Sequence, residues 1–134
     1  MQKRARVVLA ALILVCSTSS PIAQTPEFTK GTYVAHRAQD PSATIAMTFG
    51  DEGKLTVKVN GQTMVEGKYT VKGDRIEFLD QTGPMGCETG QNATYTWKLD
   101  GKKITFKVID DKCDGRRNSL ITNEWTLDGG RVKS

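Results

Sequence analysis

ATYTWKLDGKKITF, residues 93–106, carries the clearest structural signal in this chain. Its apolar and polar residues alternate on both sides of Asp100-Gly101, which is the period of half-buried β-strands. Asp-Gly pairs readily adopt the backbone angles of a tight hairpin turn. The segment therefore predicts two antiparallel strands joined by a short turn.

The same alternation recurs on both sides of this hairpin. Further strands are expected over residues 45–49, 55–59, 65–71 and 75–78, and near the ends at 31–37 and 121–127. Glycine-containing turns separate them, as at Gly50–Gly53 and Asn60-Gly61. About eight consecutive strands joined in this way form a meander, which removes its exposed edges by closing into a barrel. We therefore predict an all-β fold, an antiparallel up-and-down barrel with loops at 80–91 and 110–117 and no helix.

The first residues have the layout of a secretory signal peptide. An apolar run over residues 7–15 follows three basic residues, Lys3, Arg4 and Arg6. The run is too short to cross about 30 Å of hydrocarbon as a helix. Small and polar residues come next, and we expect cleavage after Ala23.

Cleavage there defines the domain organisation. Residues 1–23 would be removed, and residues 24–134 would form one exported domain, in the periplasm or outside the cell. The formal charge of +4 falls with the basic signal segment, so composition gives no argument for nucleic-acid binding. No later segment has the length of a membrane span. Cys16 follows Val15, where a lipid-attachment site has a small residue, so we do not expect a lipoprotein.

Two cysteines remain after cleavage, Cys87 and Cys113. An even number in an exported domain indicates a disulfide, which would join the two predicted loops. A metal site would need further His or Cys ligands nearby. We expect the disulfide, with no metal and no cofactor.

Several segments carry a family resemblance, in the order Gly31-Thr32-Tyr33, Gly53-Lys54-Leu55, residues 66–76, residues 95–106 and residues 110–116. Together with Cys87 and Trp125, they resemble the small exported lipocalin-like proteins of bacteria, within the calycin group of barrels. The resemblance implies a cup-shaped barrel that holds a small apolar molecule. Lipocalins open with Gly-x-Trp, and an arginine from late in the chain packs across that tryptophan. Here Tyr33 stands at the matching position, with Arg116 or Arg117 as the candidate arginine.

Aromatic residues gather on the predicted inward faces. In a small barrel this face is either a filled core or the lining of a cavity, and both interpretations stay open. The candidate cavity-lining residues are Tyr33, Phe49, Tyr69, Phe78, Tyr95, Trp97 and Phe106.

Charged residues crowd the second predicted loop. One interpretation is a calcium or anion site formed by Asp110, Asp111 and Asp114, although their spacing does not match an EF-hand loop. We favour the other interpretation, a structural ion pair between Asp111 and Arg116 that holds the bend. His36 is the one histidine and lacks a partner at catalytic or ligand spacing, so we do not expect an enzyme.

Three functions are compatible with this pattern. The first, which we favour, is binding of a small hydrophobic ligand by a monomeric barrel. The second is binding of another protein, as in a periplasmic inhibitor of a protease or lysozyme, through residues 81–91 or an N-terminal arm at 24–30. The third is a structural envelope protein without a ligand.

Overall fold

The structure is a computed structural model that describes residues 20, 26–88 and 90–129, without the side chain of Asp80. The expected signal peptide and its cleavage point lie outside the described residues, apart from Ser20. Within the described part, no helix is long and apolar enough to cross a membrane.

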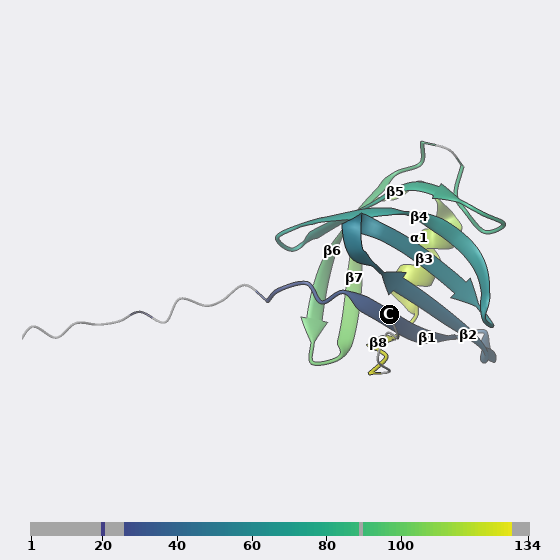
Figure 1. Ribbon diagram of the computed structural model, residues 1–134, viewed down its shortest axis with the longest axis horizontal. Helices are drawn as coiled ribbons and strands as arrows, with labels where there is room; N and C mark the ends of the chain where they lie inside the picture. The colour runs from purple at the N-terminus through teal and green to yellow at the C-terminus, as the bar shows by residue number, and fades with distance from the viewer. Residues whose placement is uncertain (1–19, 21–25, 89, 130–134) are drawn as a thin grey trace, which may run out of the picture.

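Eight antiparallel strands close into a barrel in which each strand pairs with its neighbours in sequence and β8 returns to β1 (Figure 1). This confirms the predicted fold class. The strands are β1 (Gly31–Arg37), β2 (Asp40–Phe49), β3 (Lys54–Val59), β4 (Gln62–Lys72), β5 (Arg75–Thr82), β6 (Ala93–Asp100), β7 (Lys103–Asp110) and β8 (Trp125–Leu127). A short 3-10 helix, Asp51–Gly53, joins β2 to β3.

One prediction was wrong: the chain contains an α-helix, α1, over Asp114–Thr122. Ile121, expected on the last strand, is exposed on this helix, and β8 begins only at Trp125. Leu120 is the buried residue of α1, and the Trp125 indole donates a hydrogen bond to its carbonyl oxygen. A helix held by one apolar contact shows little helical periodicity in its sequence.

Aromatic rings fill one end of the barrel. Phe28 precedes β1 and packs edge-on against Phe49 and Trp97, with ring centroids 5.1 and 5.2 Å apart. Tyr69 lies 5.0 Å from Phe49, and its hydroxyl donates to the carbonyl oxygen of Gly50. Edge-to-face pairs are a favoured aromatic arrangement. The β2–β3 end of the interior is therefore solid core.

The pairing between strands is uneven around the barrel. β5 and β6 are paired only from Arg75 to Phe78, and β5 continues to Thr82 without β6 beside it. β8 pairs with two residues of β1 and two of β7. The opening beyond Phe78 is where α1 and the β5–β6 connection meet, and the candidate site lies there.

Candidate functional site

A cavity of about 510 Å³ occupies the end of the barrel opposite the aromatic core. Its walls come from the inward faces of β2 to β5 and from one side of α1. Figure 1 shows α1 behind β3 and β4, where it faces the interior. The apolar lining residues are Ala38, Ile45, Met47, Leu55, Val57, Val59, Met64, Val65, Phe78, Met85, Leu120 and Trp125.

The structure separates the seven aromatic candidates. Phe78 lines the cavity, whereas the other six are buried in the packed interior. Strand alternation indicates which face a residue occupies but not its height along the barrel. Because Phe78 is the one member of this group that lines the cavity, the cavity wall is mainly aliphatic. The sequence feature that could have identified this wall is the row of inward-facing aliphatic residues on β2 and β3. The six packed residues are Tyr33, Phe49, Tyr69, Tyr95, Trp97 and Phe106.

The mouth of the cavity is formed by the β1–β2 turn, the β5–β6 connection and α1. Gly83 has a φ of +109°, and a Cβ there would lie 2.5 Å from the carbonyl oxygen of Met64. Only glycine fits such an approach. The connection is thereby held against β4, and the amide of Met85 donates to the same oxygen at 3.1 Å. Met85 then reaches the mouth, where its sulfur lies 4.0 Å from Nη2 of Arg37.

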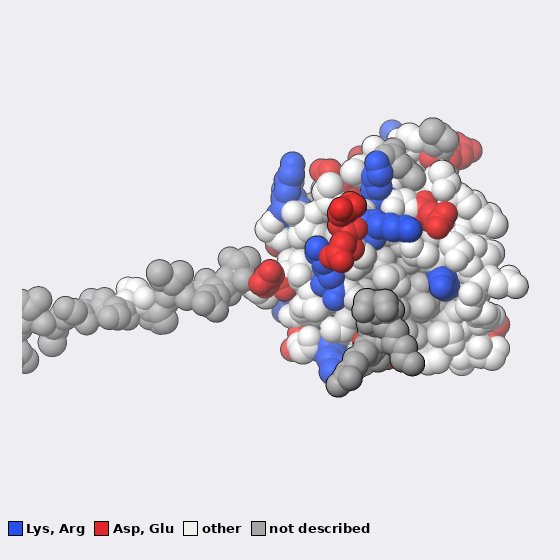
Figure 2. All heavy atoms as spheres, in the orientation of Figure 1, with Lys and Arg blue, Asp and Glu red and all other residues white. Residues whose placement is uncertain are grey.

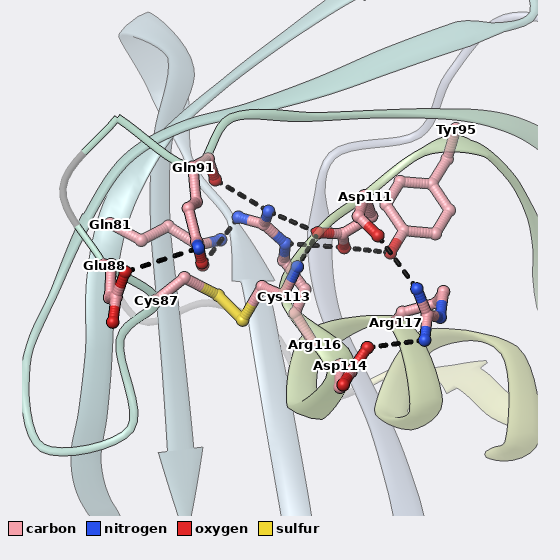
Figure 3. Close-up of polar contacts among 10 residues, drawn as sticks. All are labelled: Gln81, Cys87, Glu88, Gln91, Tyr95, Asp111, Cys113, Asp114, Arg116 and Arg117. Atoms are coloured by element: carbon pink, nitrogen blue, oxygen red, sulfur yellow. Dashed lines mark hydrogen bonds and ion pairs between the residues drawn. A yellow bond between two sulfur atoms is a disulfide. The ribbon is translucent and has the colours of Figure 1, made fainter.

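A buried ion pair joins Asp111 to Arg116 (Figure 3), and Arg116 also lines the cavity. Asp111 Oδ1 accepts from Arg116 Nη2 at 2.6 Å, and Oδ2 accepts from Arg116 Nε at 2.8 Å. The Tyr95 hydroxyl also donates to Oδ2, and the Cys113 amide donates to Oδ1 at 2.8 Å. The ion pair predicted from the sequence is present, in the two-pronged geometry that suits a guanidinium and a carboxylate.

Arg116 also bridges the opening between β5 and β6. Its Nη1 donates to the Gln81 side chain at 3.1 Å, and its Nη2 donates to the Gln91 carbonyl oxygen at 2.7 Å. Gln81 belongs to β5, and Gln91 stands just before β6. One guanidinium thus replaces the strand pairing that ends at Phe78.

The electrostatics of this cluster keep Asp111 charged and Tyr95 neutral. Burial raises the pKa of the Asp111 carboxyl, but hydrogen bonds from Arg116, Tyr95 and Cys113, with the charge of Arg116, outweigh burial and lower that pKa below its ordinary value. Burial raises the pKa of Tyr95, and Asp111 raises it further. The phenol therefore remains a hydrogen-bond donor across the physiological range.

The predicted disulfide is present between Cys87 and Cys113, with the Cα atoms 6.0 Å apart. Cys87 lies in the β5–β6 connection, and Cys113 immediately precedes α1. The bond therefore ties α1 to the opening beside the cavity. The segment 81–91, expected as a protein-binding loop, contributes Gln81 and Met85 to the cavity wall.

The other candidate residues lie apart from this cluster. Asp110 and Asp114 are exposed, and Asp114 pairs with Arg117 at 2.5 Å. Within the described residues, no group of three or more His, Cys, Asp or Glu side chains is placed to hold a metal ion. His36 is exposed on β1. On the face drawn in Figure 2, basic and acidic side chains are interspersed.

The arginine expected to pack across Tyr33 is engaged elsewhere. Arg116 and Arg117 make their hydrogen bonds around Asp111, whereas the Tyr33 hydroxyl donates to the carbonyl oxygen of Thr29 at 2.8 Å. Searches of protein-family models, curated proteins and solved structures find no match for this chain.

Proposed function

We propose that this protein is an exported lipocalin-like barrel that binds a small, largely apolar molecule in the cavity beside α1. The cavity itself carries the proposal. Its volume of about 510 Å³ lies within the range of small-molecule sites, roughly 300–1,000 Å³. Its walls are rigid strands with mainly aliphatic side chains, and the polar groups are confined to α1, Gln81 and the mouth.

Two features support a location outside the cytoplasm. The N-terminal sequence has the basic, apolar and small-residue order of a signal peptide. The Cys87–Cys113 bond is of a kind that persists in oxidising compartments and is rare in the cytosol. Both features support periplasmic or extracellular placement.

Fluorescence titration with N-phenyl-1-naphthylamine, a neutral apolar probe, tests the site. Wild-type protein should bind the probe with enhanced emission. The Val57→Trp change adds an indole to the cavity wall and should weaken binding at least about tenfold, which corresponds to about 1.4 kcal/mol. Val59→Trp fills the same space from a second position on β3.

Lys58→Trp is the matched control. Lys58 lies between the two valines on β3 but is exposed, so the same side chain is added outside the barrel. Its probe affinity should stay within about twofold of wild type, a change well below 1 kcal/mol. A wild-type protein that binds no probe, or equal weakening by all three variants, would overturn the proposal and favour the protein-binding and structural alternatives.

A further inference from the structure

The charged residues of the cavity wall are all of one sign. In the described part of the chain they are two arginines, Arg37 and Arg116, without an aspartate, glutamate or lysine. Asp111 neutralises Arg116 in the buried ion pair. Arg37 is therefore the cation that a bound molecule meets at the mouth.

Arg37 has no direct carboxylate partner among the described residues, because none lies within ion-pair distance. Asp40 is opposite it in the β1–β2 register, but accepts hydrogen bonds from the amide and hydroxyl of Ser42. These bonds chiefly lower the pKa of Asp40, with a smaller contribution from the charge of Arg37. Within the described part of the chain, the one side-chain hydrogen bond of Arg37 is to the sulfur of Met85, a weak acceptor, so its strong donors are available to an oxyanion.

The apolar wall can adapt its shape to a flexible chain. Three of its residues are methionines, Met47, Met64 and Met85, on three different segments around the cavity. Methionine is unbranched and adapts its shape to irregular apolar groups. These apolar side chains and Arg37 line the same cavity.

Resting on the proposed function, we propose that the ligand is an amphipathic anion. A single alkyl chain lies against the aliphatic wall, and a compact oxyanion such as a carboxylate binds the guanidinium of Arg37. The planar guanidinium matches such an oxyanion with two parallel hydrogen bonds. Arg37 then selects the head group, while the strands select the chain.

Displacement of N-phenyl-1-naphthylamine by dodecanoate and by dodecanol separates the head group from the chain. Wild-type protein should bind dodecanoate at least about tenfold more tightly than dodecanol at low salt, since hydrogen bonds to charged groups are the stronger kind. This preference should shrink as salt screens the charge. Arg37→Gln should abolish the preference and leave dodecanol affinity within about twofold.

Arg75→Gln is the matched control, since Arg75 is an exposed arginine at the β4–β5 turn and does not line the cavity. It should change neither affinity. Equal wild-type binding of the two compounds, or a preference that survives Arg37→Gln, would overturn the anion proposal and leave an apolar site standing. A wild-type protein that does not bind the probe would overturn the proposed function itself.

Discussion

Asp111 carries a buried negative charge, and Arg116 neutralises it. Its side chain is fully buried, and the Arg116 side chain is 7% exposed. Burying two charges is costly, and the cost is recovered only when each hydrogen-bonding atom has a partner. Here the carboxylate accepts from Arg116, Tyr95 and Cys113, and the guanidinium also reaches Gln81 and Gln91. The pair therefore holds several segments in one arrangement.

Asp111→Asn should lower the free energy of unfolding by about 3–5 kcal/mol, because it leaves the Arg116 charge buried without its partner. Urea denaturation measures the change. Asp114→Asn is the control, since its pair with Arg117 is exposed and should contribute less than about 1 kcal/mol. Similar losses in both variants would show that burial does not govern the strength of this pair.

Acid should remove the contribution of Asp111 to stability. The folded-state pKa of its carboxyl lies below the ordinary value, so the folded state holds the proton more weakly than the unfolded chain. The stabilisation is complete well above the unfolded value of about 3.9, and is lost as the pH falls through the lowered folded value. Urea midpoints measured from pH 6 to pH 2 should fall less steeply for Asp111→Asn than for wild type. Parallel curves would assign the acid sensitivity to other carboxylates.

At the scale of elements, α1 depends on its attachments more than on its own sequence. It is nine residues long, contains Gly115, and buries only Leu120. Isolated helices of this length are marginal in water. The disulfide and the hydrogen bonds of Asp111 fix the first turn of α1 in place. Both lie beside the opening between β5 and β6.

Removing the disulfide by the paired change Cys87→Ser and Cys113→Ser should lower the free energy of unfolding by about 2–5 kcal/mol, the usual range for small disulfide-bonded domains. Urea denaturation of the oxidised and reduced wild type gives the same comparison. Reductant should leave the serine variant unchanged, which controls for its other effects. A stability that is indifferent to reductant in the wild type would contradict a structural role for the bond.

For the whole molecule, ligand binding and folding should be linked. A ligand that binds only the closed barrel adds about 2.7 kcal/mol to the free energy of unfolding at one hundred times its dissociation constant. Urea denaturation with and without saturating dodecanol measures this gain. The same measurement on Val57→Trp, at the same dodecanol concentration, is the comparison. The slope against urea should stay constant, since the surface exposed on unfolding is nearly the same. An equal gain in the variant would indicate binding outside the cavity.

Much of the architecture follows from the sequence, and the exceptions have physical causes. Alternation and turn residues predict the strands, since a half-buried sheet requires both. The pair of Asp111 and Arg116 is also predictable, because the two residues are close in the chain. Helix α1 is not, because distant contacts at Cys87 and Gln81 stabilise it. The position of each side chain along the barrel axis depends on strand register, which alternation in the sequence does not give. The aliphatic wall of the cavity therefore could not be predicted from alternation alone.

The seam between β1 and β8 has a consequence for biosynthesis. Tyr33 pairs with Leu127, so the strands that seal the barrel come from opposite ends of the described chain. A nascent chain leaving the ribosome presents β1 long before β8, and pairings between such distant segments form slowly. Until Trp125 and its neighbours emerge, the outer edge of β1 stays open. The barrel can therefore close only after nearly all of the described chain has been synthesised, because its last strand completes the pairing of its first.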